Sequence, residues 1–152
     1  MDEIIKSYLA CLIDCNSNTR IKYKNKSEPT IELTVFVNKE YRDILQVLVN
    51  LKEYNTKIET FKYASRNKCN DKICCNLYND NAVMFLNDIY GYLRTTRIKR
   101  IAFIIAELNE LYKTDTVKMD TVNSNNSKHL SILKHINSDK IDILVKELET
   151  LN

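Results

Sequence analysis

Glycine and proline are almost absent from this 152-residue chain, which contains one of each. Average proteins contain roughly 7% glycine and 5% proline. The turns must therefore be built mainly from Asn, Asp and Ser, which bond to their own backbone and tolerate left-handed conformations. The chain is instead rich in Asn, Lys, Ile and Tyr, a bias that fits an AT-rich genome such as that of a virus, an organelle or a parasite.

Signals for export or membrane insertion are also missing. The chain opens without a basic, apolar and small-residue leader, and no apolar run approaches the ~20 residues that span a bilayer. We therefore expect an intracellular protein, in cytoplasm, nucleus or organelle, with no membrane partner. Hydrophobic residues at 44% and charged residues at 28% are ordinary globular values, and the length suits one domain with a real core.

The cysteines lack the pattern of a disulfide framework. They are five in number, with no CxxC pair among them. Cys11 and Cys15 are one helical turn apart, whereas Cys74 and Cys75 are adjacent and would face opposite sides of a strand. We expect buried, reduced thiols, and a zinc site is the alternative.

Hydrophobic periodicity in the first half predicts a helix, two strands and a helix. Residues 2–14 have helical spacing with a wide apolar face. Residues 19–26 and 30–37 alternate as strands and form a hairpin around an Asn-Lys-Ser-Glu-Pro turn. Residues 38–54 return to helical spacing, with Asn38 as the predicted cap.

The second half repeats this order. Residues 56–64 and 71–79 are strand-like, and residues 80–93 predict a helix that ends near Gly91. A further helix is predicted over 96–113, and a polar break then precedes two short closing helices. These closing helices are expected over 128–136 and 138–151. The predicted class is α+β, with an α-β-β-α-β-β-α core, a twisted antiparallel sheet and a C-terminal helical tail.

Basic residues gather in two segments, although the net charge of +3 does not by itself imply nucleic-acid binding. The first segment places four cations on one face of a strand, namely Arg20, Lys22, Lys24 and Lys26. The second carries Arg94, Arg97, Lys99 and Arg100. A strand face of this kind fits contacts to nucleic-acid phosphates and bases, and a solvated strand face is the equally weighted alternative.

Residues 9–17, Leu-Ala-Cys-Leu-Ile-Asp-Cys-Asn-Ser, resemble the signature of the LAGLIDADG homing endonuclease family, with five of nine positions matching. The motif ends a first helix that leads into a basic hairpin, and the order α-β-β-α-β-β-α follows the family core. The resemblance covers residues 1–112, and 113–152 would be a helical extension of the same domain. An unrelated α+β domain is the alternative.

The resemblance implies a homodimer, because family members with one motif pack their motif helices at a two-fold axis. The implied contact residues are Leu9, Ala10, Leu12 and Ile13. Ala10 is small enough for a close helix approach. Cys11 stands where the motif has glycine and would open the crossing slightly.

The resemblance also implies divalent-metal DNA cleavage, with an acid at the next-to-last position of the motif. That position is Asn16, which lacks the negative charge that hard cations such as Mg²⁺ prefer. Asp14 survives, but its family equivalent is mostly structural. Arg94 or Arg97 would be the basic residue beside the scissile phosphate, while an ungapped match falls on Thr96. Asp14, Asn16, Arg94 and Arg97 are thus the catalytic candidates, with no certain cofactor and Mg²⁺ only if cleavage remains.

We therefore hypothesise a degenerate, single-motif relative that binds duplex DNA or structured RNA as a homodimer without efficient cleavage. Arg20, Lys22, Lys24, Lys26 and Arg100 are its predicted nucleic-acid contacts. One alternative is a viral or organellar interaction protein that uses the fold to bind a protein partner. The other is an active DNA endonuclease with an unusual metal site.

Overall fold

The computed structural model describes residues 1–24, 28–60, 72–120 and 127–151. Its helices and strands follow in the order α1 (Glu3–Asn16), β1 (Ser17–Lys24), β2 (Glu28–Asn38), α2 (Arg42–Asn50), β3 (Ile58–Thr60), β4 (Lys72–Tyr78), α3 (Asn79–Ile89), α4 (Thr96–Asp120) and α5 (Ser127–Leu151). Short 3₁₀ turns at Lys39–Tyr41, Lys52–Tyr54 and Tyr90–Tyr92 flank α2 and follow α3. The predicted α+β class and the α-β-β-α-β-β-α order are confirmed.

The sheet has four antiparallel strands in the order β1-β2-β4-β3. The two central strands, β2 and β4, come from the two predicted hairpins and pair from Glu32 with Tyr78 to Asn38 with Lys72. Strand β3 is described only over Ile58–Thr60, so most of the third predicted strand lies outside the described residues. This arrangement brings residues about forty positions apart side by side at the centre of the sheet.

One core lies between the sheet and the helices. Strand β2 contributes alternate apolar residues, since successive side chains point to opposite faces of a sheet. The buried side chains that meet there are Leu9, Ala10, Leu12, Ile13, Ile31, Leu33, Val35, Leu45, Leu48, Leu77, Phe85, Leu86, Ile98, Ile101, Ile105 and Leu108. Residues of all five α-helices belong to this cluster, so the helices cover one face of the sheet. The opposite face carries mainly polar residues.

Helix α1 begins with a side-chain cap, because the Asp2 carboxylate accepts a hydrogen bond from the Ile5 backbone N–H at 2.9 Å. It ends at Asn16, where the Ser17 hydroxyl donates to the Ile13 carbonyl at 2.7 Å and the chain continues directly into β1. The motif helix and the basic strand are therefore joined with no intervening loop.

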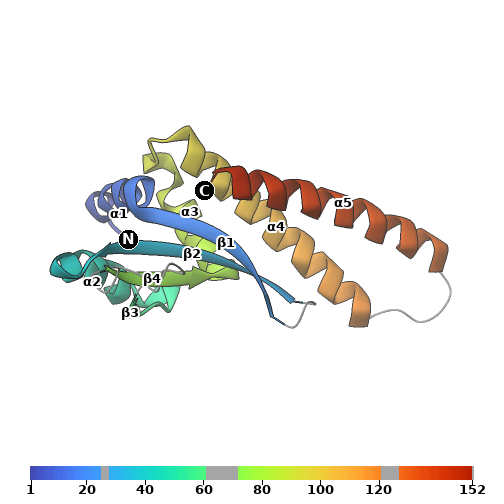
Figure 1. Cartoon of the computed structure of the whole chain (residues 1–152), viewed down its shortest axis with the longest axis horizontal. Helices are drawn as coiled ribbons and strands as arrows, with labels where there is room; N and C mark the ends of the chain where they lie inside the picture. The colour runs from blue at the N-terminus through green and yellow to red at the C-terminus, as the bar shows by residue number, and fades with distance from the viewer. Residues whose placement is uncertain (25–27, 61–71, 121–126, 152) are drawn as a thin grey trace, which may run out of the picture.

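Helices α4 and α5 form a long antiparallel pair that projects from the sheet, with the C-terminus returned toward α1 and β1 (Figure 1). The prediction of two short closing helices is wrong, because α5 runs unbroken from Ser127 to Leu151. Packing of Leu144 and Leu148 in the shared core outweighs the weak helix propensity of the Asn-Ser-Asp segment at 137–139. The expected division at residue 112 falls inside α4 and stays a prediction.

Within the described ranges, no helix is both long enough and apolar enough to cross a membrane.

Candidate nucleic-acid interface

The polar face of the sheet lies opposite the helix-packed core. The strand register places on it Asn18, Arg20 and Lys22 of β1, Thr30, Glu32, Thr34 and Phe36 of β2, and Lys72, Cys74, Asn76 and Tyr78 of β4. Lys24 continues this face of β1 by register, while Lys26 lies outside the described residues. The predicted alternation of basic residues on one strand face is therefore present for Arg20 and Lys22.

A buried glutamate joins two cations of strand β1 on this face, Arg20 and Lys22. Glu32 is 0% exposed and lies opposite Arg20 in the β1–β2 register. Its Oε2 atom accepts a hydrogen bond from Arg20 Nε, and its Oε1 atom accepts one from Lys22 Nζ at 2.7 Å. Burying a carboxylate is costly unless it is paired, so these two partners stabilise Glu32 in its charged form.

The ionisation of Glu32 reflects this balance. Burial alone would raise the pKa of its carboxyl group, but the hydrogen bonds and charges of Arg20 and Lys22 outweigh burial and hold that pKa below its usual value. Tyr78 faces the same carboxylate from β4, and its pKa is raised by burial and by the nearby charge of Glu32. Three strands therefore supply one ionic cluster at the centre of the polar face.

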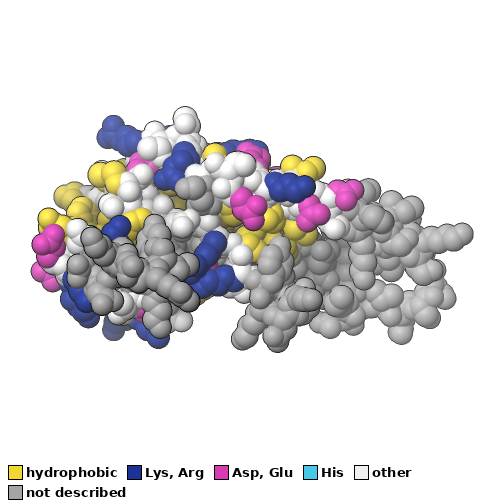
Figure 2. All heavy atoms as spheres, in the orientation of Figure 1, with side chains coloured by type: hydrophobic (Ala, Val, Ile, Leu, Met, Phe, Trp, Pro, Cys, Tyr) yellow, Lys and Arg dark blue, Asp and Glu magenta, His cyan; other side chains and the backbone are white. Residues whose placement is uncertain are grey.

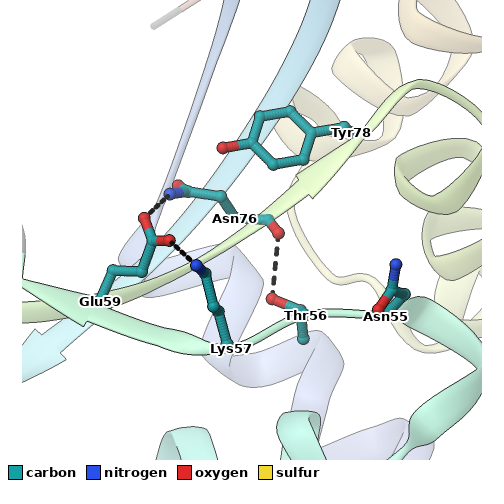
Figure 3. Close-up of a pocket in the computed structure, with 6 residues that line it drawn as sticks. All are labelled: Asn55, Thr56, Lys57, Glu59, Asn76 and Tyr78. Atoms are coloured by element: carbon teal, nitrogen blue, oxygen red, sulfur yellow. Dashed lines mark hydrogen bonds and ion pairs between the residues drawn. The ribbon is translucent and has the colours of Figure 1, made fainter.

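Further along β4, a hydrogen-bonded chain crosses the polar face. The Thr34 hydroxyl donates to Asn76 Oδ1 at 2.8 Å, and Asn76 Nδ2 donates to Glu59 at 3.3 Å. Glu59 also pairs with Lys57 at 3.2 Å, and the Thr56 hydroxyl donates to the Asn76 carbonyl. A pocket on this face is lined by Asn55, Thr56, Lys57, Glu59, Asn76 and Tyr78, with the Tyr78 ring on the opposite side from Lys57 (Figure 3).

At the far end of β4, Lys72 packs its ammonium group 4.9 Å from the centre of the Phe36 ring. Cys74 lies two residues along β4 on the same face. It is buried, and burial raises the pKa of its thiol. The thiol of Cys75 points to the core, where burial raises its pKa to about 11. The prediction that Cys74 and Cys75 face opposite sides of a strand is confirmed by their register.

The predicted catalytic residue Asp14 holds the start of α4. Its Oδ2 atom accepts the Arg94 backbone N–H at 2.7 Å, and its Oδ1 atom accepts the Thr95 hydroxyl at 2.7 Å and the Thr95 N–H at 3.3 Å. The Thr95 hydroxyl oxygen in turn accepts the Ile98 N–H at 3.3 Å, so Thr95 caps α4. Both carboxylate oxygens of Asp14 are thereby used in joining the end of α1 to the start of α4.

The end of α1 does not fit a Mg²⁺ site. Asn16 offers a neutral amide, and the oxygens of Asp14 already accept three hydrogen bonds. Across the described ranges, no group of three or more His, Cys, Asp or Glu side chains is placed to hold a metal ion.

The second basic segment lies along the joint between α4 and α5. Arg97 donates to the Leu151 carbonyl at 3.0 Å, which fixes the end of α5. Arg100 binds Glu147 through two hydrogen bonds, Nε to Oε1 at 2.5 Å and Nη2 to Oε2 at 2.8 Å. Its guanidinium also lies 5.0 Å from the centre of the Phe103 ring. These contacts hold the side chains of Arg97 and Arg100 on α5 and not on the polar face of the sheet.

The four predicted dimer residues of α1, Leu9, Ala10, Leu12 and Ile13, are buried in the core of the chain. Their part in a dimer contact stays a prediction. The outward face of α1 instead carries Ile4, Tyr8, Cys11 and Cys15. These positions recur every three to four residues and form one apolar stripe along the helix. The expectation of buried thiols is therefore wrong for Cys11 and Cys15, right for Cys74 and Cys75, and outside the described residues for Cys69.

The distribution of surface charge differs between the two ends of the molecule. Figure 2 shows Lys and Arg side chains gathered at the lower left, below α2, whereas the surface of α5 alternates acidic, basic and hydrophobic side chains. Two ion pairs join α4 to α5, Arg100 with Glu147 and Lys140 with Glu107.

Several residues at these sites escaped the sequence analysis. Alternation along residues 30–37 predicts only a polar strand position for Glu32, and no sequence pattern predicts a role for Thr95. Strand alternation does place Glu32 and Arg20 on polar faces, but the facing register depends on the turn between the strands. The Asp14–Thr95 contact joins positions eighty-one residues apart, which no local pattern signals.

Comparison with known proteins identifies the fold. The homing endonuclease I-CvuI, in complex with its target, matches 98% of this chain and 82% of its own, with a TM-score of 0.61 and 14% sequence identity. The LAGLIDADG meganuclease I-AabMI, bound to uncleaved DNA, matches 73% of this chain and 38% of its own, with a TM-score of 0.57 and 12% identity. The LAGLIDADG homing endonuclease I-SmaMI, bound to cleaved DNA, matches 72% and 37%, with a TM-score of 0.54 and 14% identity.

No protein-family model matches the sequence, and no curated protein matches it. At this level of identity, the likeness is one of fold. The chain has the mixed α+β architecture of homing endonucleases, including an antiparallel four-stranded sheet and C-terminal helices.

Proposed function

We propose that this chain is a homing-endonuclease-like protein that binds nucleic acid through the polar face of its sheet. In this proposal it is an intracellular homodimer joined through α1, its target is duplex DNA or structured RNA, and efficient cleavage has been lost. The observation that carries the proposal is the polar sheet face with Arg20, Lys22 and Lys72, opposite a core shared by five helices.

The polar face has the chemistry that nucleic-acid binding needs. Arg20 keeps 57% of its side chain exposed and Lys22 keeps 47%, although both contact Glu32. A major groove admits a two-stranded β-ribbon, whose alternate side chains reach bases and phosphates. Homing endonucleases of this fold have been crystallised with DNA, which supports the same use of the sheet here.

Fluorescence anisotropy with labelled random-sequence duplexes tests the binding. We expect micromolar-range affinity at low salt and a linear fall of log K with log salt concentration, because phosphate contacts release counterions. The double variant Arg20→Ala/Lys22→Ala should weaken binding at least tenfold, roughly the effect of losing two phosphate contacts. Lys140→Ala/Lys146→Ala on α5 removes the same charge and should change affinity far less. Equal effects of the two variants, or no binding to DNA or RNA at low salt, would contradict the proposal.

The apolar stripe of α1 supports dimerisation. Ile4 is 82% exposed, and with Tyr8, Cys11 and Cys15 it makes one continuous outward face. An isologous contact between two copies of such a stripe would remove it from water. Cysteine at positions 11 and 15 is larger than glycine or alanine, so the crossing should be wider than one between small residues.

Thiol labelling tests the dimer in the native protein. In a dimer through α1, Cys11 and Cys15 should react with maleimide several-fold more slowly at high protein concentration than at a concentration that favours monomers. The variant Ile4→Glu should lower the mass measured by light scattering toward that of one chain. Ile143→Glu alters a side chain on α5 that is 65% exposed and should leave the mass unchanged. A concentration-independent labelling rate would count against α1 as the contact.

The donor groups at the end of α1 support the loss of cleavage. Asn16 provides no charge where the motif has an acid, and Asp14 is used in capping α4. We expect the wild type to leave a supercoiled plasmid library intact in Mg²⁺ or Mn²⁺, and Asn16→Asp to raise nicking by restoring a carboxylate. Wild-type cleavage that Asp14→Asn abolishes would instead support a residually active endonuclease.

A second candidate function is favoured by Glu32. Because this carboxylate neutralises part of the charge of Arg20 and Lys22, the centre of the polar face is less basic than the sequence alone predicts. A viral or organellar interaction protein that uses the fold to bind a protein partner fits this reduced charge. It predicts no salt-dependent affinity for any duplex and no difference between the two double variants above.

A further inference from the structure

Arg20 is bonded to Glu32 through a single nitrogen of its guanidinium, Nε. Glu32 accepts a hydrogen bond from Nε of Arg20, while its other oxygen is taken by Lys22 at 2.7 Å. A carboxylate whose second oxygen is occupied in this way is not free to form the two parallel hydrogen bonds typical of an arginine–carboxylate pair. Among the described residues, the hydrogen bond of Arg20 to Glu32 uses Nε and neither Nη group, and 57% of the Arg20 side chain is exposed.

The pair between Arg100 and Glu147 shows the closed arrangement in the same molecule. There, Nε and Nη2 bind both oxygens of one carboxylate, at 2.5 and 2.8 Å. Arg100 thereby uses its guanidinium edge to join α4 to α5. Arg20 differs because Lys22 occupies the second oxygen of the same carboxylate, so Glu32 is bonded to Nε of Arg20 and to neither of its Nη groups.

We propose that Arg20 recognises guanine in the major groove and that Glu32 is its positioning residue. This inference rests on the proposed nucleic-acid binding and names the base that one side chain reads. The two Nη groups match the O6 and N7 acceptors that guanine presents in the major groove, the commonest specific arginine contact. Lys22, a flexible point charge, is suited to a neighbouring phosphate.

The burial of Glu32 is what makes this arrangement directional. An unpaired arginine has several rotatable bonds and reaches phosphates in many geometries, whereas a base contact requires a fixed plane. A carboxylate with no exposed surface, held on the central strand β2, fixes Nε of Arg20 and hence the plane of the fork. Base recognition is therefore favoured over a phosphate contact for Arg20.

Selection of randomised duplexes by the full-length wild type tests the proposal. We expect an enriched guanine whose replacement by 7-deazaguanine, which lacks the N7 acceptor, weakens binding by about 5- to 150-fold. For Arg20→Lys, the same replacement should change affinity less than about twofold. Arg42→Lys makes the same chemical change at an exposed residue of α2 and should keep the full guanine preference.

The Glu32→Gln variant tests the positioning role. It frees Lys22 from the carboxylate, so affinity for random duplexes should rise while discrimination against 7-deazaguanine falls. If Glu32 had a purely structural role, Glu32→Gln would change the unfolding midpoint. The ratio of affinities for the guanine and 7-deazaguanine duplexes would stay that of the wild type.

Two outcomes would overturn the inference. In the first, Arg20→Lys weakens or keeps binding equally for all sequences, which makes Arg20 a phosphate contact while the proposed function survives. In the second, no duplex is bound at all, so the proposed function fails and the base assignment fails with it.

Discussion

Arginine meets glutamate in two regions of this molecule, and the two pairs behave differently. On the sheet, Glu32 is fully buried and shared between Arg20 and Lys22. On the hairpin of α4 and α5, Glu147 is partly exposed and serves Arg100 alone, through both of its oxygens. Each arginine was predicted from the sequence as a nucleic-acid contact, yet the contacts of Arg100 join two helices.

The difference teaches that a basic segment is defined by its acidic partners as much as by its own residues. A carboxylate that accepts two parallel hydrogen bonds from one edge of a guanidinium leaves fewer of its donors for a ligand. A buried carboxylate shared by two cations leaves part of each available, and it depends on both for its own stability. The sheet pair should therefore be sensitive to charge, while the hairpin pair should be tolerant.

Charge reversal should separate the two regions most strongly. We expect Arg20→Glu to lower the free energy of unfolding by about 2–4 kcal/mol, because it places a second carboxylate beside buried Glu32. Arg100→Glu makes the same change at the surface, where water screens the repulsion, and should have a small fraction of that effect. Urea denaturation followed by circular dichroism measures both. Similar losses for the two variants would erase the distinction between the pairs.

Acid should reveal the same contrast with a smaller effect. The pKa of Glu32 is depressed from its ordinary value of 4.5, so its contribution to stability is present above that value and is lost as the pH falls through the folded-state pKa. Glu32→Gln should therefore flatten the acid limb of the curve of unfolding free energy against pH, below about pH 4.5.

Glu147 supplies the control for this titration. Its pKa is also lowered, by the hydrogen bond from Arg100, but the pair lies at the surface. Glu147→Gln should flatten the acid limb less than Glu32→Gln does. A larger loss of the acid-dependent stability for Glu147→Gln than for Glu32→Gln would contradict this contrast.

Salt should produce the smallest difference. Surface ion pairs weaken as ionic strength rises, whereas pairs with a buried member are screened less. In double-mutant cycles, the coupling between Arg100 and Glu147 should fall toward zero between 0.05 and 1 M NaCl, where the Debye length shrinks to about 3 Å. The coupling between Arg20 and Glu32 should keep most of its value. Equal screening of the two couplings would show that Glu32 is open to solvent ions.

Local patterns predicted most of the fold because the signals of helices and strands are local. The helical spacing of 2–14, the alternation of 30–37 and the apolar run after residue 96 all correspond to observed elements. The break expected near residue 137 was wrong, since packing along α4 extends α5 through a weakly helical segment. At the candidate site, the basic face of β1 was predictable from its period of two. The buried partner of that face, Glu32, was not predictable, nor was the contact between Asp14 and Thr95 at the start of α4.

The sequence by itself determined which faces are apolar, where a neutral Asn16 replaces the acid of the motif, and that cations alternate along residues 20–24. Only the tertiary structure decided what those side chains contact. It buried Leu9, Ala10, Leu12 and Ile13 in the core of the chain and turned Cys11 and Cys15 outward. It also set Glu32 beneath Arg20. The physical reason is that periodicity specifies a face of one element, whereas a charge pair or a helix contact depends on the register between elements far apart in the chain.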